Sequence, residues 1–323
     1  MPKILKHFAS PDLMSDLPDK QINLVTQVCL DETSLIETIK EGYDILLADG
    51  SVPLSAKLFE AGSQLQRVIF FDIGLIDRVD LVAATRHGVA VALPQTRSQN
   101  AVAEFTLALI LMLQRHLVQA LVEGRAGNWP RGTLDHLRGS EQKGSILGII
   151  GWSRIGKLVA EKASALGMHI LVYSPNANPN EITYPLLGLT ELLEKADVVS
   201  LHTRLTPMNR HLIGENELRT MKPNAYLVNT ARGALIDEAA LVRALKENWI
   251  AGAALDVLEV EPPPRDHPLL HLQNTFITPH VAWNTIEVQA LAKADIQEEL
   301  RRAVAGELPQ HCANPEVLHS KRR

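Results

Sequence analysis

Three side chains suited to acid–base and ionic chemistry each follow a short apolar run in the C-terminal half of the chain: Arg232, Glu261 and His280. A histidine titrates near neutrality and can give a proton to a developing alkoxide. A carboxylate on its other ring nitrogen would fix the tautomer, and an arginine presents a fork of donors to a carboxylate and the adjacent carbonyl oxygen. These residue types together indicate hydride transfer between a nicotinamide and a 2-keto or 2-hydroxy acid.

Each of these residues also has an ordinary structural interpretation when taken alone. Arg232 could be a surface cation, Glu261 an acid in the loop before Pro262, and His280 a turn residue after Pro279. Ligands of open α/β sheets bind outside the carboxyl ends of the strands. Because all three residues follow predicted strands, we expect them to converge on one crevice.

A glycine-containing turn, Gly151-Trp-Ser-Arg-Ile-Gly156, separates a continuous apolar run from a segment with helical periodicity. Gly151 permits a tight turn, and Gly156 lets the following helix approach the strand. The helix N-terminus would offer N–H groups and the positive end of its dipole to a pyrophosphate. Ser153 stands where a dinucleotide fingerprint has its middle glycine. The turn alone is therefore a weak signal, but its strand–turn–helix setting favours a nucleotide site.

The end of the next predicted strand bears on the choice of cofactor. A carboxylate at that position would bind the ribose 2′-hydroxyl of NAD, but the sequence has Ser174 there. Loss of the acid removes repulsion against a 2′-phosphate, while no arginine or lysine follows directly to bind one. NAD and NADP both stay open, and the serine inclines the prediction toward NADP.

Alternating elements would position these residues. Short apolar runs alternate with helical segments up to residue 98 and again from Ile146 onward, which predicts parallel βαβ units and an α/β fold. Residues Asn100 to Leu117 are apolar around most of a helical circumference, so we expect a helix buried on nearly all sides. From Val118 to Gly144 glycine, proline and charges dominate, which predicts a long loop or linker that is either functional or makes contacts outside its own domain.

Composition excludes several classes of function. The 323 residues carry a formal net charge of −5 and no basic block, which argues against a nucleic-acid or membrane partner. Two cysteines cannot form a disulfide framework, and with no predicted signal peptide they favour a cytoplasmic location. His267 and His271 raise the alternative of a metal-dependent hydrolase. Pro268 between them and the lack of a nearby third ligand argue against it, so we expect no metal.

Over nearly its whole length, and strongly from Asn100 onward, the chain resembles the D-isomer-specific 2-hydroxyacid dehydrogenases, which include glycerate dehydrogenase, glyoxylate reductase and phosphoglycerate dehydrogenase. The resemblance lies in NAVAEFTLALIL, LGIIGWSRIG, DVVSLHTRLTPMNRHLIG, MKPNAYLVNTARGALIDEAALVRAL, AGAALDVLEVEP and TPHVAW. It implies that Arg232 binds substrate, that His280 is the acid/base and that Glu261 pairs with it. It further implies a homodimer and a cofactor site lined by Arg154, Ile155, Ser174, Thr206, Thr230, Ala231 and Asp256.

The same resemblance implies two doubly wound parallel-sheet domains, with a Rossmann cofactor domain (residues 99–284) inserted into a flavodoxin-like substrate domain (residues 1–98 and 285–323). A substrate loop would contain Ile73, Gly74 and Leu75. The family usually has more glycines in that loop, and here Asp72 would repel a substrate carboxylate. Trp283 resembles the tryptophan of glycerate dehydrogenases and is a further substrate-binding candidate.

Two more departures keep a second hypothesis open. Ser153 replaces a glycine, and Arg204 stands where the family commonly has a proline, which places a cation on the cofactor side. A regulatory protein that senses NAD(H) without turnover would tolerate such changes. The presence of Arg232, Glu261 and His280 argues for an enzyme, since a sensor needs no proton donor.

Overall fold

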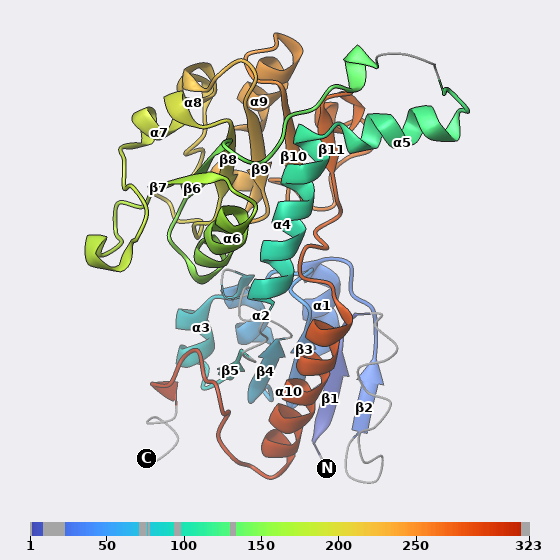
Figure 1. Cartoon of the computed structure of the whole chain (residues 1–323). Helices are drawn as coiled ribbons and strands as arrows, with labels where there is room; N and C mark the ends of the chain where they lie inside the picture. The colour runs from blue at the N-terminus through green and yellow to red at the C-terminus, as the bar shows by residue number, and fades with distance from the viewer. Residues whose placement is uncertain are drawn as a thin grey trace. The chain divides into compact units, whose positions relative to one another are not determined.

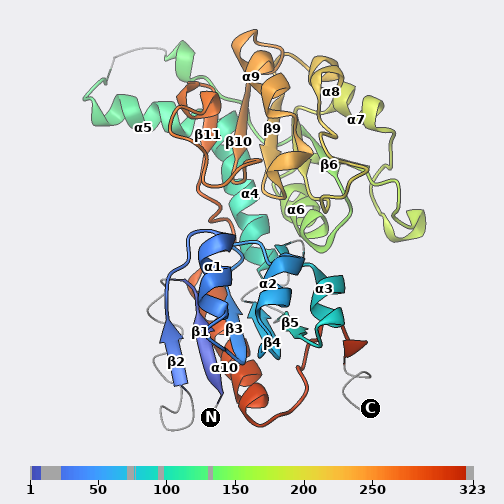
Figure 2. The same cartoon turned by 180° about the vertical axis from the view of Figure 1, so that it is seen from behind.

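The structure is a computed structural model that describes residues 2–8, 23–70, 76, 78–93, 98–129 and 134–317. The chain forms two compact units: unit 1 contains residues 1–97 and 285–323, and unit 2 contains residues 98–284. Figures 1 and 2 show the elements of each unit from opposite sides. Many helices begin at a polar side chain that accepts a first-turn N–H, which satisfies one of the groups that a helix start leaves open. These N-cap residues include Asp31, Ser55, Asp80, Asp237 and Thr285.

Unit 1 contains a five-stranded parallel sheet in the order β2-β1-β3-β4-β5, the flavodoxin-like order. Three helices pack on one face of the sheet and the last helix packs on the other. The strands are β1 (Lys3–Lys6), β2 (Asn23–Thr26), β3 (Ile45–Ala48), β4 (Arg67–Phe70) and β5 (Ala90–Ala92), and the helices are α1 (Glu32–Ile39), α2 (Ala56–Ala61), α3 (Leu81–Arg86) and α10 (Ile286–Val304).

Unit 2 contains a six-stranded parallel sheet in the order β11-β10-β9-β8-β6-β7. Helices α4 and α6 pack on one face of this sheet, and α7, α8 and α9 pack on the other. The strands are β6 (Ile146–Ile150), β7 (His169–Tyr173), β8 (Val198–Leu201), β9 (Tyr226–Asn229), β10 (Gly252–Leu255) and β11 (Thr275–Ile277), and the helices are α4 (Gln99–Gln114), α6 (Arg154–Ala165), α7 (Leu189–Lys195), α8 (Glu215–Thr220) and α9 (Glu238–Lys246).

The outer edge of this sheet, beside β7, carries a remnant of one more strand. Leu186 forms an isolated parallel bridge with Val172, and the Val172 N–H donates to the carbonyl of Pro185. Counting this bridge as the third position gives the strand order 3-2-1-4-5-6 of a Rossmann fold, followed by one additional strand. The predicted α/β class with two doubly wound parallel sheets is confirmed.

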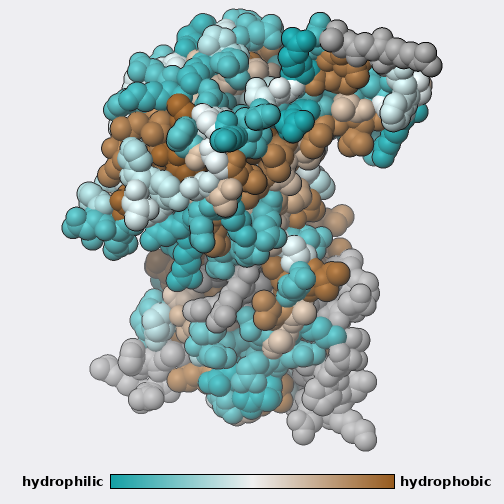
Figure 3. All heavy atoms as spheres, viewed as in Figure 1, coloured by the Kyte–Doolittle hydropathy of each residue, from teal (hydrophilic) through white to brown (hydrophobic). Residues whose placement is uncertain are grey.

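The prediction of a loop from Val118 onward was wrong at its start. Leu117–Arg125 forms helix α5, which follows α4 after a left-handed turn at His116. The signal was missed because no side chain of α5 is buried within the chain, and the glycines and charges that follow dominated the window. Figure 3 shows hydrophobic residues on this helix, where Leu121 and Val122 are more than half exposed.

Helix α4 also differs from its prediction. Only one face is buried, while Phe105, Leu107, Leu111 and Met112 are half-buried and Ala108 is exposed. Along the described ranges no single helix is long and apolar enough to span a membrane. Helices α4 and α5 satisfy that length and composition test only together, across a bend of 67°. The described residues therefore leave part of the apolar surface of α4 and α5 uncovered.

Candidate active site

The turn between β6 and α6 has a backbone that only glycine can adopt. Gly151 has a φ of +102°, and a Cβ on it would lie 2.6 Å from the carbonyl oxygen of His202. A Cβ on Gly156 would lie 2.4 Å from the Gly151 carbonyl oxygen. Both distances are far shorter than van der Waals contact. The predicted roles of the two glycines, a tight turn and a close helix–strand approach, therefore have a direct geometric basis.

Ser153, the residue in place of the middle glycine, caps the helix. Its hydroxyl accepts the Gly156 N–H at 3.2 Å, and its backbone is extended, as an N-cap requires. The N–H groups of Arg154 and Ile155 lie in the first turn, where an α-helix supplies no acceptor of its own. Two glycines that keep side chains away and a helix N-terminus that presents N–H groups fit a pyrophosphate.

The residue that follows β8 is a buried histidine beneath this turn. His202 is 4 % exposed, and its Nε2 lies 2.8 Å from the Ser200 hydroxyl. Burial lowers the pKa of His202 to about 3, so the ring is neutral at any physiological pH. We did not single out this histidine as a site residue from the sequence. Because this buried ring is neutral, the β6–α6 turn presents backbone dipoles rather than the charge of a titrating His202 side chain.

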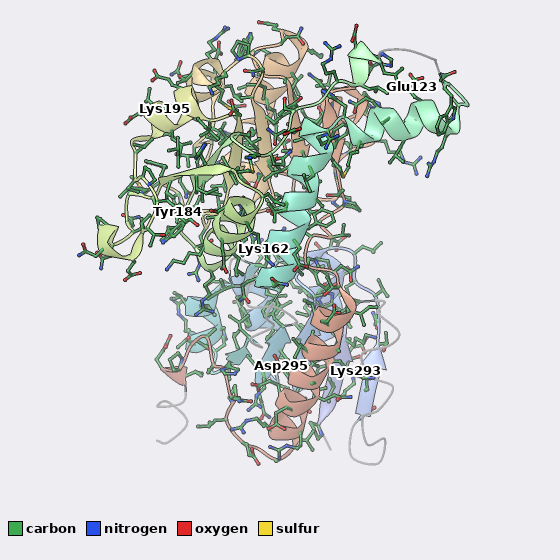
Figure 4. All side chains as sticks on the ribbon, viewed as in Figure 1. Glu123, Lys162, Tyr184, Lys195, Lys293 and Asp295 are labelled. Atoms are coloured by element: carbon green, nitrogen blue, oxygen red, sulfur yellow. The ribbon has the colours of Figure 1, made fainter. Side chains whose placement is uncertain are left out.

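The segment after β7 begins with Ser174, which is half-buried. The neighbouring chain is held against the glycine turn by Trp152, whose ring meets Tyr184 edge-on at 5.9 Å between centroids. Figure 4 labels Tyr184 in this segment. Lys157 lies on the first turn of α6, and its Nζ is 3.7 Å from Oε2 of Glu181, which belongs to the same segment as Tyr184. The predicted 2′-hydroxyl position is therefore attached to the same turn that would bind the pyrophosphate.

The loop after β9 is organised by a buried amide. Asn229 has no exposed surface, accepts the Ala231 N–H at 2.9 Å and donates to the Arg232 carbonyl at 2.9 Å. The Thr230 hydroxyl lies 2.9 Å from that of Thr106 on α4. The Arg232 guanidinium donates to the Ala231 carbonyl at 2.7 Å. Asn229 was not predicted, although an asparagine that ends a buried strand is a recognisable turn signal.

The loop after β10 carries Glu261 and is fixed from two directions. One carboxylate oxygen of Glu261 accepts the Leu258 N–H at 2.9 Å. A Cβ on Gly233, the residue after Arg232, would fall 1.9 Å from the Leu258 carbonyl carbon, so the two loops meet backbone to backbone. The loops that carry the arginine and the glutamate therefore meet through a contact that only glycine allows.

The loop after β11 places His280 against Glu261. Nδ1 of His280 lies 2.7 Å from Oε2 of Glu261, and His280 has a φ of +53°, which is uncommon for a residue with a side chain. Asp256, which is 1 % exposed, accepts the Val281 and Ala282 N–H groups, each at 2.9 Å. Backbone held in a sparsely populated region by its surroundings is typical of a functional position.

This geometry leaves a defined proton-transfer atom. Because Nδ1 is engaged by Glu261, Nε2 is the ring nitrogen that can exchange a proton with a substrate, and the side chain is 41 % exposed. Asp256, predicted to line the cofactor, has backbone N–H groups and the Thr278 hydroxyl on its two oxygens. Trp283, predicted to contact substrate, donates its indole N–H to the His280 carbonyl at 3.0 Å. Both therefore also shape the loop that carries the histidine.

The remaining predicted residues have simple placements. Thr206, exposed in the loop after β8, interacts with Asn209 and with none of the predicted site residues in the described hydrogen bonds. Ile73, Gly74 and Leu75, together with Asp72, lie outside the described residues. His267 and His271 have different partners, Glu238 and the Arg265 carbonyl. Within the described ranges no group of three or more acidic, histidine or cysteine side chains could hold a metal ion.

Comparison with known proteins decides the family. Residues 107–282 match the NAD-binding domain of the D-isomer specific 2-hydroxyacid dehydrogenases. The chain belongs to this family. It is 40 % identical over 289 residues to a glyoxylate reductase of Thermofilum pendens, an alignment that covers 88 % of this chain and 85 % of that one.

Two further comparisons agree. A D-3-phosphoglycerate dehydrogenase of Methanocaldococcus jannaschii is 38 % identical over 90 % of this chain, but the match covers only 56 % of that longer protein. The crystal structure of the TT0316 protein from Thermus thermophilus superposes with a TM-score of 0.87 at 33 % identity, covering 97 % of this chain and 100 % of that one. The chain is an NAD(P)-dependent 2-hydroxyacid dehydrogenase, and its family implies 2-keto acid substrates.

Proposed function

We propose that Arg232, Glu261 and His280 perform the reaction, with a small 2-keto acid as substrate. The observation that carries this assignment is the 2.7 Å contact between His280 Nδ1 and Glu261 Oε2, which leaves Nε2 for the substrate. Glu261 is in turn held by the Leu258 N–H. A histidine oriented by a carboxylate that is itself oriented is the arrangement that general acid–base catalysis needs.

The roles follow from the chemistry of each side chain. When bound, the nicotinamide supplies the hydride for reduction and accepts it for oxidation. His280 donates the proton to the alkoxide oxygen through Nε2, and Glu261 keeps Nδ1 paired and the ring oriented. Arg232 binds the substrate carboxylate and polarises the carbonyl beside it through its fork of N–H donors. Ile73, Gly74, Leu75 and Trp283 complete the proposed substrate contacts.

For the cofactor, we propose NADP in preference to NAD. Ser174, in place of an acid at the end of β7, places no negative charge against a 2′-phosphate. Gly151, Ser153, Gly156 and the first-turn N–H groups of Arg154 and Ile155 would bind the pyrophosphate. Residues of the three neighbouring loops would line the rest of the site, namely Thr206, Thr230, Ala231 and Asp256.

We further propose a homodimer in the cytoplasm. Leu121 and Val122 on α5 are exposed, and several apolar side chains of α4 are half-buried; a second copy would cover them. Cys29 and Cys312 are free thiols, consistent with a reducing compartment. For the two-domain roles, unit 1 would bind the substrate and unit 2 the cofactor.

A substrate panel tests this function. NADPH and NADH consumption would be followed with glyoxylate, hydroxypyruvate, pyruvate and larger 2-keto acids, starting with glyoxylate because of the Thermofilum pendens relative. We expect turnover with a small 2-keto acid and a lower KM for NADPH. Tight cofactor binding without turnover of any of these substrates would instead support the NAD(H)-sensing alternative.

A further inference from the structure

A second acid–histidine pair lies behind the loop that carries Glu261. Glu238 is the first residue of α9, and His267 precedes the short helix Pro268–His271. Glu238 Oε2 lies 3.1 Å from His267 Nε2, and each side chain is only 16 % exposed. Two titratable groups paired this far from water are rare on a protein surface, so the pair needs an explanation beyond solubility.

The pair is connected to Glu261 through one stretch of main chain. The other oxygen of Glu238, Oε1, accepts the Glu259 N–H at 2.7 Å. The preceding N–H, that of Leu258, donates to Glu261 itself at 2.9 Å. Two consecutive N–H groups are thus bound by two different carboxylates. Glu238 therefore helps to fix the main chain that binds the Glu261 carboxylate, and with it the position of this carboxylate relative to His280.

The buried environment favours one arrangement of protons. Nδ1 of His267 is buried, and none of the described residues offers it a hydrogen-bond partner, so a proton there would be an unsatisfied donor. The favoured tautomer carries its proton on Nε2 and donates it to Glu238. Burial raises the pKa of Glu238, and His267 opposes that rise. The pair can then hold a negative charge on Glu238, close enough to Glu261 for the two carboxylates to repel.

The other charged groups around Glu238 are compatible with a negative charge on its carboxylate. The neighbouring loop residue Glu259 is paired with Arg210 and with His211, at 3.3 Å from His211 Nε2. Asp237, the residue before Glu238, caps α9 by accepting the Ala240 N–H. The groups that act electrostatically on Glu238 are His267, Glu261 and His211.

We propose that Glu238 and His267 are positioning residues for the Glu261–His280 pair. They hold the Leu258–Glu261 main chain, and the charge on Glu238 favours the protonated state of the Glu261–His280 pair. Neither side chain needs to touch substrate or cofactor. This inference rests on the catalytic roles proposed above for Glu261 and His280.

Two substitutions separate the charge of Glu238 from its hydrogen bond. Glu238→Gln keeps a carbonyl oxygen for the Glu259 N–H but removes the charge. We expect the plateau kcat to stay within about threefold and the alkaline limb of keto-acid reduction to move down by about 0.5–1 on the pH scale. Glu238→Ala removes both contacts, so the same displacement should come with a plateau kcat lower by about tenfold.

A direct readout avoids dependence on turnover. The ring Cε1–H signal of His280, followed by NMR across pH in Glu238→Gln, should titrate at lower pH than in the unsubstituted protein. Glu247→Gln is the matched control: it removes a carboxylate at the other end of α9, where Glu247 accepts the Trp249 indole N–H. This control should change neither the NMR titration nor the pH profile.

The outcomes separate this inference from the function on which it rests. An alkaline limb and an NMR titration that stay unchanged in Glu238→Gln, with unchanged kcat in Glu238→Ala, would overturn the positioning role. If Glu238→Ala does not fold, the Gln variant and its NMR titration decide alone. Failure of the catalytic assignment shows up elsewhere, as undiminished turnover in His280→Ala, even where the Glu238→Gln titration moves as expected.

Discussion

The turn after β6 and the loops after β9, β10 and β11 lie at the same edge of one parallel sheet, yet they present different groups. The β6–α6 turn presents backbone: two glycines, a serine that caps the helix, and beneath them a histidine that burial keeps neutral. The loops after β9, β10 and β11 present ionisable side chains. Glu261 contacts the His280 ring, and Asn229 holds the main chain around Arg232.

This difference supports the proposed division of roles, with cofactor binding at the β6–α6 turn and proton transfer at the later loops. Fixed dipoles recognise an anionic cofactor without gaining or losing protons. Proton transfer needs a titratable ring whose orientation is fixed by neighbours, and those neighbours must themselves be fixed. Substitutions in the first region should therefore change cofactor affinity, and substitutions in the second should change kcat and its pH dependence.

The largest effect is expected for His280→Ala. Removal of the proton donor should lower kcat for keto-acid reduction by at least ~100-fold, the usual contribution of general acid catalysis. The dissociation constant for NADPH, measured by nucleotide fluorescence, should stay within about twofold because the β6–α6 turn is untouched. His271→Ala is the control, since that exposed ring contacts only the Arg265 carbonyl among the described hydrogen bonds. An undiminished kcat would remove His280 from the chemistry.

Gly156→Ala should have the opposite effect, weakening NADPH binding while largely preserving kcat. Its Cβ would approach the Gly151 carbonyl oxygen to 2.4 Å, so the turn or the start of α6 must shift. We expect the dissociation constant for NADPH to rise by about tenfold, the equivalent of about 1.4 kcal/mol, with kcat at saturating cofactor changed far less. Gly188→Ala is a matched control, because a Cβ there meets nothing within 4 Å. Equal affinities in the two variants would contradict a pyrophosphate site at this turn.

Ser174→Asp tests the other end of the cofactor site. An acid at the end of β7 can bind a ribose 2′-hydroxyl and repels a 2′-phosphate. The ratio of kcat/KM with NADH to kcat/KM with NADPH should rise by roughly tenfold, as a repulsion of about 1.4 kcal/mol requires. Ser164→Asp, on the exposed part of α6, controls for added charge. A ratio that does not change would exclude Ser174 as the reader of the 2′-position.

Part of this arrangement could be predicted from local signals in the sequence. Glycine turns and strand–helix alternation are local signals, and they predicted the parallel sheets and located Gly151 and Gly156. Arg232, Glu261 and His280 each follow a separate strand. Their common location could be inferred because ligands of open α/β sheets bind outside the carboxyl ends of the strands. The contact between Glu261 and His280 came from family resemblance, and the structure supplies its distance.

The sequence did not show the residues that hold the site side chains and loops in place. Glu238 and His267 are 29 positions apart, and nothing local marks them as a pair. Asp256 was expected to line the cofactor, but its backbone contacts come from residues 25 and 26 positions further along. Helix α5 was missed because the described residues bury none of its side chains. Long-range hydrogen bonds and exposed apolar side chains leave no periodic trace in a sequence.

The dependence of stability on pH tests whether the buried histidine beneath the β6–α6 turn is neutral. His202 has a folded-state pKa of about 3, whereas an unfolded histidine titrates near 6.5. Between these values the unfolded chain binds a proton that the folded chain excludes. The free energy of unfolding should therefore fall as the pH drops below 6.5, and the contribution of His202 has a slope of up to ~1.4 kcal/mol per pH unit.

His202→Gln can keep a hydrogen bond to Ser200 but cannot titrate. We expect the dependence of the free energy of unfolding on pH, measured by urea denaturation between pH 4 and 6.5, to become shallower by ~1 kcal/mol per pH unit. His169→Gln, at an exposed position on β7, should keep the original slope. If both variants keep it, His202 accepts a proton in the folded state, and the β6–α6 turn would not be the purely dipolar site that distinguishes it from the loops after β9, β10 and β11.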